Sequence, residues 1–353
     1  MAGTPHSALV LQGGGALGAY ELGAARAFYE DPNFAPDVIA GVSIGAITAA
    51  LLARPGRGRK PLEALEAFWR EVTVPGTFLP PPLRPYASFL GNRKFYVPRL
   101  DFLVWPTWTY FYETAPLRET LAKLVDVDAL ADPKAVPKLL VSATDVEKGE
   151  IVYFRSDGKE GPLTLDHIMA SGSLPPPFPQ TEIKNKTDNK KRAYWDGGLS
   201  DNTPLGAVLD ELDKLEGAAD GERTVYVVNL FPKQAPVPQN MIEIMARMKN
   251  LQFVNKTEQD VKLMCRFNQV AALMEALEGL GEGNPLRDHD AFKQVQAQGY
   301  KRVPRIVSIT TTEAMHQFDD ADFSPEAIKK RADEGYAQTK RALQNPIDPC
   351  ADV

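Results

Sequence analysis

A serine flanked by glycines stands near the N-terminus, in the sequence Gly41-Val42-Ser43-Ile44-Gly45. The apolar run before it predicts a β-strand, and the small apolar residues after it predict a helix. In such a strand-to-helix turn the serine adopts a strained backbone conformation, and Gly41 and Gly45 are needed because side chains there would clash. The hydroxyl is then exposed at a helix N-terminus, where the helix dipole favours negative charge. This pattern predicts a nucleophile elbow for attack on a carbonyl carbon.

A second glycine-rich turn, Gly13-Gly14-Gly15, follows the first apolar run of the chain. Three glycines allow consecutive backbone N–H groups to face one cavity and hold an oxyanion, and the loss of one such donor costs about 3–4 kcal/mol of transition-state binding. With Gly18, the turn also matches the G-x-G-x-x-G pattern of dinucleotide sites. That pattern needs an acidic residue at the end of the second strand, whereas Asp37 lies at its start. An oxyanion hole is therefore favoured over a cofactor site.

A nucleophilic serine needs a base, and Asp196 is the better candidate. It ends a predicted strand, and Gly197-Gly198 allow the chain to turn there and approach another element closely. An aspartate is a weak base at its usual pKa of about 3.9, but burial beside an apolar acyl pocket would raise the pKa. A Ser–Asp dyad would then be workable.

Two alternatives to this assignment remain open. On its own, an Asp-Gly-Gly sequence is more often a hairpin turn or a helix cap. Histidine is the usual base, and the chain has four, of which His6 precedes the first strand and His167 follows no strand in a glycine-rich turn. His289 and His316 are not preceded by such a turn either, but they fit the order Ser…Asp…His of a triad.

Four sequence blocks, in this order and spacing, resemble those of the patatin-like phospholipase family. They are Gly13-Gly14-Gly15, the Gly41–Gly45 elbow, Ala170-Ser171 with its proline-rich continuation to Pro179, and Asp196-Gly197-Gly198, spanning about residues 7–210. The resemblance implies a three-layer α/β/α fold with a mostly parallel sheet, and hydrolysis of lipid acyl esters without a metal or cofactor. By matching position, Ser43 would be the nucleophile and Asp196 the base. The three glycines would form the oxyanion hole, and the block from Ala170 would shape the wall of the site.

The glycine block departs from the family at its fifth position. Many members carry Arg or Lys there, where this chain has Leu17. A cation could support a phosphate or the oxyanion loop, so the choice between a phospholipid, as for a phospholipase A or lysophospholipase, and a neutral ester, as for a carboxylesterase, stays open. The resemblance implies a lipid or acyl-ester substrate and is compatible with transient membrane-surface contact. A lipid-binding protein that keeps the pocket without turnover is a further alternative.

The predicted elements explain how the motifs can meet. Strands are expected at 7–12 and 37–42, each followed by a helix, and a right-handed crossover would bring both turns to one sheet edge. Further helices are expected at 61–72, 116–125, 163–171, from 204, 239–280 and 324–343, and further strands at 138–145, 150–155, 193–196, 223–230 and 303–309. We expect a single α/β domain over 1–353, with an insertion at about 74–112 and a helical C-terminal extension at about 238–353.

Two apolar segments have less certain partners. The insertion at 74–112 alternates prolines with aromatic residues and either fills a satellite core or forms a lid or wall for an acyl chain. The long helix predicted from 239 carries an apolar stripe at helical spacing, which is expected to pack in the core. The stripe consists of Met241, Ile244, Met245, Met248 and Leu251.

The composition limits the class of protein and its setting. A formal net charge of −6 argues against a broad nucleic-acid surface. No apolar run reaches the roughly 20 residues needed to span a bilayer, and the N-terminus lacks the basic region of a secretory signal. Cys265 and Cys350 have no metal-ligand spacing and are expected to be ordinary thiols. A cytoplasmic setting is expected, although an effector exported without a signal would have the same features.

Overall fold

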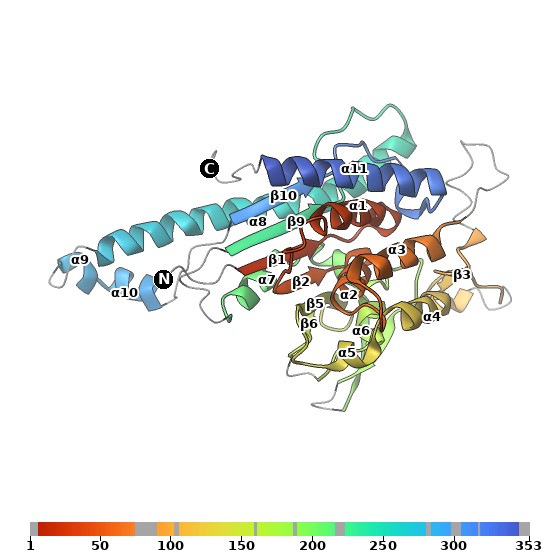
Figure 1. Cartoon of the computed structure of the whole chain (residues 1–353), viewed down its shortest axis with the longest axis horizontal. Helices are drawn as coiled ribbons and strands as arrows, with labels where there is room; N and C mark the ends of the chain where they lie inside the picture. Colours follow the sequence, from red (N-terminus) through yellow and green to blue (C-terminus); the bar gives the residue numbers. More distant parts are fainter. Residues whose placement is uncertain are drawn as a thin grey trace.

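A mixed sheet runs through the centre of the protein, with helices on both of its faces (Figure 1). The computed structural model describes residues 6–74, 90–101, 106–158, 161–185, 189–215, 223–279, 284–297, 305–316 and 318–345, except for the side chains of 255–258 and 267. Within these residues the main sheet has eight strands, in the order β10-β9-β1-β2-β5-β8-β7, with β6 also paired to β5. The predicted three-layer α/β/α fold with a mostly parallel sheet is confirmed.

The strands of this sheet lie close to their predicted positions, except β7, which was not predicted. They are β1 (His6–Leu11), β2 (Val38–Gly41), β5 (Lys138–Asp145), β6 (Glu150–Arg155), β7 (Thr181–Lys184), β8 (Lys191–Asp196), β9 (Arg223–Asn229) and β10 (Arg305–Thr310). The five strands from β10 to β5 run parallel, whereas β6 and β8 pair antiparallel with β5, and β7 pairs antiparallel with β8. A separate short pair joins β3 (Val97–Pro98) to β4 (Tyr112–Glu113).

The register of the central strands brings the sequence motifs to one edge. Leu11 pairs with Gly41 across β1 and β2, so the glycine-rich turn and the serine turn begin side by side. Gly41 in turn pairs with Val141 on β5, and Ala143, two residues further along β5, pairs with Asp196. The predicted meeting of both turns at one sheet edge is therefore confirmed, and β8 delivers the aspartate to the same edge.

Helices cover each face of the sheet because the buried strands are apolar on both sides. Leu9, Leu11 and Ile39 face one apolar cluster, whereas the alternating residues Ala8 and Val10 face the other. The longer helices are α1 (Ala19–Phe28), α2 (Ile44–Ala53), α3 (Pro61–Val72), α4 (Ala115–Leu124), α6 (Leu165–Ser171), α7 (Leu205–Leu212), α8 (Met241–Glu278), α10 (Asp290–Ala297) and α11 (Pro325–Gln344), with shorter α5 (Val127–Ala131) and α9 (Pro285–Asp288). Helices α1 to α4, α6 and α11 contribute to the first cluster, and α7 and α8 to the second.

The C-terminal segment is part of the same layers. It supplies the edge strand β10, and α11 packs along α1 (Figure 1). Ser324 caps α11 by accepting a hydrogen bond from the Ala327 amide (3.3 Å), with Pro325 as the first helical residue. Helices α9 and α10 were not predicted, and they lie beyond the far end of α8 (Figure 1).

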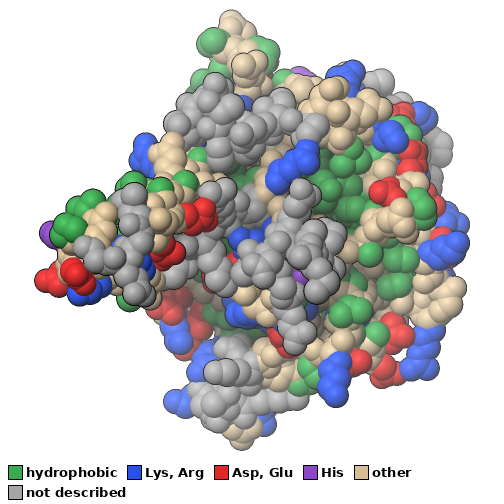
Figure 2. Space-filling model, turned by 60° about the vertical axis from the view of Figure 1, so that its left-hand side comes forward, with side chains coloured by type: hydrophobic (Ala, Val, Ile, Leu, Met, Phe, Trp, Pro, Cys, Tyr) green, Lys and Arg blue, Asp and Glu red, His purple; other side chains and the backbone are tan. Residues whose placement is uncertain are grey.

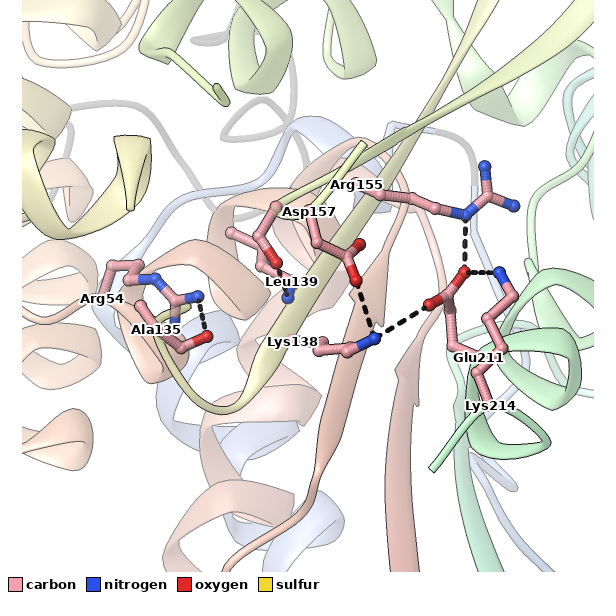
Figure 3. Close-up of polar contacts among 9 residues, drawn as sticks. Arg54, Ala135, Lys138, Leu139, Arg155, Asp157, Glu211 and Lys214 are labelled. Atoms are coloured by element: carbon pink, nitrogen blue, oxygen red, sulfur yellow. Dashed lines mark hydrogen bonds and ion pairs between the residues drawn. The ribbon is translucent and has the colours of Figure 1, made fainter. Parts of the chain in front are cut away.

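A buried ion cluster ties α7 to the opposite, amino-terminal end of β5 (Figure 3). The Glu211 carboxylate on α7 receives Arg155 Nε (2.8 Å) and Lys214 Nζ (2.6 Å), and lies 3.5 Å from Lys138 Nζ. Lys138 also pairs with Asp157 (2.7 Å). Because these residues come from α7, β5 and the β6 region, the cluster fixes the helix against the sheet away from the serine edge.

Two predictions about individual side chains are wrong. The apolar stripe of α8, from Met241 to Leu251, is not core, since its five members are between 40% and 69% exposed. Periodicity indicates that a helix has an apolar face but not whether anything covers it, and here the opposite face of α8 is the one that packs. Cys265 is disulfide-bonded rather than an ordinary thiol, and Cys350 lies outside the described residues.

The proline-rich insertion is divided between core and surface. Phe95 and Tyr96 are buried in the first apolar cluster and Tyr112 packs against it, whereas Phe111 is 52% exposed. Several other aromatic residues of the insertion lie outside the described residues, namely Phe78, Tyr86, Phe89, Phe102 and Trp105.

The outer surface carries charges of both signs. Figure 2 shows Lys and Arg side chains interspersed with Asp and Glu around the edge of one face, with hydrophobic side chains between them. Charges of both signs are therefore present on this face (Figure 2), on a chain whose formal net charge is −6. Within the part of the chain that the structure describes, no helix is both long and apolar enough to cross a membrane.

Candidate active site

The serine turn has the geometry that its sequence predicts. Ser43 lies between β2 and α2 with φ of 54° and ψ of −121°, a region that costs a non-glycine residue about 1–3 kcal/mol. Its amide donates to Ser171 Oγ (2.9 Å), which helps to hold this conformation. A Cβ on Gly41 would lie 2.1 Å from the Gly45 carbonyl oxygen, and one on Gly45 would lie 2.4 Å from the Leu11 carbonyl oxygen. Both glycines are therefore required by close packing, and Ser43 is half-buried with access to solvent.

The triple-glycine turn lies directly against this serine. A Cβ on Gly13 would come within 3.0 Å of Ser43 Cβ and 3.2 Å of the Val42 carbonyl oxygen, so the close approach requires glycine. Among the described residues, no acceptor takes the backbone amides of Gly13 and Gly14. Gly15 opens a short 3₁₀ turn, η1 (Gly15–Gly18), with φ of +58°. The turn thus has free donors beside the serine, as an oxyanion site requires.

Asp196 lies at the end of β8 and is only 2% exposed. Its Oδ1 accepts the Gly198 amide (2.7 Å), and its own amide donates to the Ser173 carbonyl (2.9 Å). Its Oδ2 is buried, and no described residue forms a hydrogen bond with it. Burial raises the pKa of Asp196 to about 6, although the Ser43 hydroxyl and the Gly198 amide each act to lower it.

The structure therefore brings Ser43, Asp196 and the glycine turn into one place. The Ser43 hydroxyl is near enough to stabilise the carboxylate of Asp196, but no short, aligned hydrogen bond joins the two side chains. Catalytic hydrogen bonds are often long in an unliganded site and shorten when substrate binds. Chemically, the site combines an accessible hydroxyl, a carboxylate whose pKa is close to neutrality, and unpaired amide donors.

Comparison with known proteins gives two matches to family models. A model described as patatin-like phospholipase matches residues 9–209, which is more than half of the chain. The chain belongs to the patatin-like phospholipase family. A second model, described as patatin phospholipase, matches residues 251–348. Membership assigns the protein to the lipid acyl hydrolases and implies lipid substrates.

Other comparisons are more distant. No curated protein matches the sequence. Among solved structures, VipD from Legionella pneumophila is similar over 97% of this chain and 67% of its own chain, with 17% sequence identity and a TM-score of 0.39.

Two polar residues that support this patatin-like site were not singled out in the sequence. Asn202 Nδ2 donates to the Gly13 carbonyl (3.1 Å) and thereby helps to orient the glycine turn. Gln12 Oε1 accepts the Leu230 amide (2.7 Å), and Gln12 Nε2 donates to Thr203 Oγ1 (3.2 Å). Gln12 has a local signal, because it is a buried polar residue between an apolar strand and the glycines. For Asn202, the only signal in the sequence is its position six residues after Asp196.

A cation does lie beside the glycine block, although Leu17 occupies its fifth position. Arg331 on α11 donates from Nη1 to the Asp322 carbonyl (2.8 Å) and to the Ala16 carbonyl (3.4 Å). Its Nη2 lies 3.5 Å from Asp319 Oδ1. The second family model covers this helix. The C-terminal segment therefore supplies a guanidinium that contacts the η1 turn. Arg331 and Ala16, the two residues in this contact, are 315 positions apart in the sequence.

The four histidines occupy different positions in the fold, and His316 lines a cavity that Leu17 of the glycine block also lines. His6 begins β1, and its Nδ1 lies 3.3 Å from Asp37 Oδ2. His167 belongs to the capping box of α6, and His289 follows α9 at the surface. The His316 amide donates to Asp319 Oδ2 (2.7 Å) in the turn after β10. No histidine is among the groups that act on the pKa of Asp196. In the described ranges, no group of three or more His, Cys, Asp or Glu side chains is arranged to hold a metal ion.

Proposed function

We propose that the protein is a metal-independent serine acyl hydrolase in which Ser43 is the nucleophile and Asp196 is the base. The observation that carries this proposal is the state of Asp196. Its carboxyl is buried beside Ser43 with a pKa of about 6, and Oδ2 has no hydrogen-bond partner among the described residues. A base with a pKa near the working pH combines the correct ionisation state with useful basicity.

The first half-reaction transfers the acyl group to the enzyme. Asp196 Oδ2 takes the proton of the Ser43 hydroxyl as Oγ attacks the ester carbonyl carbon. The amides of Gly13 and Gly14, with that of Gly15, hold the oxyanion of the tetrahedral intermediate. When the carbon–oxygen bond of the ester breaks, the leaving alcohol takes the proton from Asp196. The acyl group then remains on Ser43.

The second half-reaction releases the acid. Asp196 takes a proton from water, which attacks the acyl-serine and forms a second oxyanion in the same turn. Its collapse releases the fatty acid and returns the proton to Ser43 Oγ. The substrate is a lipid acyl ester. We propose a lysophospholipase, phospholipase A or carboxylesterase type of activity, and the contact of Arg331 with the η1 turn supplies the cation that Leu17 does not.

The test uses a water-soluble chromogenic ester and a fluorophosphonate probe. Wild type should hydrolyse the ester and be labelled at Ser43, whereas Ser43→Ala should lose both, with activity reduced by about 10³-fold or more. His289→Ala and His316→Ala are matched controls. They should retain wild-type rates if Asp196 is the base, whereas a histidine triad predicts that one of them loses activity.

Two results would contradict the proposal. Hydrolysis by Ser43→Ala at the wild-type rate would show that Ser43 is not the nucleophile. Failure of wild type both to label and to hydrolyse any ester in a lipid panel would instead favour a lipid-binding protein without turnover.

A further inference from the structure

Helix α8 has an apolar face that the protein itself leaves open. This Met face consists of Met241, Ile244, Met245 and Met248, which are between 40% and 69% exposed. On the opposite side of the same turns, Ala246 and Asn250 are buried, and the Asn250 side chain donates to the Pro232 carbonyl (2.9 Å). The first turns of α8 are therefore amphipathic in the reverse sense to a typical surface helix, because the face rich in large apolar side chains points outward.

The Met face extends beyond the sheet edge at which Ser43 lies. The Phe253 carbonyl accepts Gln12 Nε2 (3.4 Å), so this point of α8 is level with the residue before the glycine turn. Further along, Val261 and Met264 pack in the cluster formed by the middle of β1, so α8 runs back toward the amino-terminal end of the strands, and Figure 1 shows α9 and α10 at that far end. The turns before Phe253 thus project from the active-site edge by up to about 18 Å.

Basic residues flank this face. A helix turns about 100° per residue, which places Arg247 on one side of the Met face and Lys249 on the other. Between positions 230 and 254 the chain has three basic residues, these two and Lys233, against one acidic residue, Glu243. Arg247 donates to the Lys233 carbonyl (2.9 Å), and Lys249 pairs with Asp320. The formal sum for this segment is +2, and it is +1 when Asp320, the partner of Lys249, is included, on a chain whose formal net charge is −6.

We infer that the Met face docks the enzyme onto an anionic lipid surface. The inference rests on the proposed function, because it explains how a lipid ester reaches Ser43 from an aggregate. Long apolar side chains enter the acyl boundary, and flanking cations stay at the level of the anionic headgroups. Flexible methionines suit such a surface because they adapt to irregular apolar neighbours. The Met face projects beyond the sheet edge that carries the glycine turn, so docking brings that edge close to the lipid.

The experiment measures flotation of the full chain with vesicles, in a Ser43→Ala background so that no lipid is consumed. Vesicles of phosphatidylcholine alone are compared with equal parts of phosphatidylcholine and phosphatidylglycerol. The test variant combines Met241→Glu, Met245→Glu and Met248→Glu. The matched control combines Leu263→Glu and Leu273→Glu, which are similarly exposed on the distant half of the same helix, at 50% and 59%.

The expected result is preferential binding to the phosphatidylglycerol vesicles, weakened by salt. The test variant should lose at least about tenfold in apparent affinity, and the control variant should lose little. With Ser43 restored, both variants should hydrolyse a soluble monomeric ester at the wild-type rate, which shows that they are folded and separates docking from catalysis.

Four outcomes would overturn the inference. The test variant could float as well as the Ser43→Ala parent, or the control could lose as much as the test variant. Equal binding to both vesicle types would show that the protein does not recognise the anionic lipid. Sedimentation could also show that the test substitutions dissociate a dimer without changing flotation, in which case the Met face joins two copies of the chain. A protein that floats but hydrolyses no ester would refute the proposed function and leave the docking surface standing.

Discussion

Two buried carboxylates in this protein are treated in opposite ways. Glu211, near the amino-terminal end of the sheet, has a side chain only 3% exposed and is surrounded by Arg155, Lys214 and Lys138 (Figure 3). Asp196, at the carboxyl edge, is equally buried but has one amide hydrogen bond and no ion pair among the described residues.

We propose that this difference separates a structural carboxylate, Glu211, from a reactive one, Asp196. The ion pairs of Glu211 with three cations tie its helix to the sheet. A buried carboxylate without a cation has a raised pKa, because burial penalises its charged form. Burial raises the pKa of Asp196 to about 6, and this value suits the proton acceptor that we propose. The predictions below test this contrast, from the largest expected effect to the smallest.

The strongest contrast is in catalysis. Asp196→Asn keeps the shape of the side chain and the acceptor for the Gly198 amide, but it removes the base. We expect the kcat for a soluble ester to fall by about 10²–10⁴-fold. Glu211→Gln, measured per folded molecule in the same assay, should stay within a fewfold of wild type. Equal losses in the two variants would show that Asp196 is only another structural carboxylate.

The same substitution should raise stability at alkaline pH. The folded pKa of Asp196 is about 6, above its ordinary value of 3.8, so the folded state retains a proton that the unfolded state releases. Wild type therefore loses stability as pH rises from about 4 through 6, by a total of about 3 kcal/mol, and the loss is constant above that range. Urea unfolding at pH 4 and pH 8 should show Asp196→Asn gaining stability relative to wild type at pH 8 only. No pH dependence in this difference would contradict the buried, unpaired state.

Glu211→Gln should act in the opposite direction. Breaking a buried ion pair costs about 3–5 kcal/mol, and because the three cations are partly exposed we expect about 2–3 kcal/mol. Chemical denaturation at neutral pH measures this loss. Lys214→Ala is the control, since its side chain is 57% exposed and its removal should cost less than about 1 kcal/mol. A Glu211→Gln protein as stable as wild type would show that the cluster does not hold α7.

Asn202 gives the smallest of the expected effects. Asn202→Ala removes the donor to the Gly13 carbonyl and leaves that buried acceptor unpaired, which corresponds to about 1–2 kcal/mol. We expect kcat to fall by about tenfold with little change in KM, because the oxyanion turn acts in the transition state. Asn202→Asp, which cannot donate, should resemble the alanine variant. A change in KM alone would place Asn202 in substrate binding instead.

The motifs that are local in sequence could be predicted. Gly41, Ser43 and Gly45 define their own turn, and the apolar runs before each glycine block determine parallel neighbours on the sheet. Asp196 could be nominated because it ends a strand before two glycines. What raises its pKa, however, is burial by the rest of the fold, which no local pattern contains.

The contacts that join distant segments could not be predicted. Asn202 reaches the carbonyl of Gly13 across 189 positions, and Arg331 reaches Ala16 across 315. Either pairing depends on the packing of several helices. The prediction that the α8 stripe packs in the core was wrong for a related reason. Hydrophobic periodicity at Met245 and its neighbours indicates an apolar face, but it does not indicate whether other parts of the protein cover that face.

The most direct test of the central claim is the pH dependence of fluorophosphonate labelling at Ser43. In wild type, the second-order labelling rate should rise with an apparent pKa of about 6, because Asp196 must be ionised to take the serine proton. In Asp196→Asn the rate should be at least about 10²-fold lower and should not show this ionisation. Labelling of Asp196→Asn at the wild-type rate, with the same pH profile, would contradict the account.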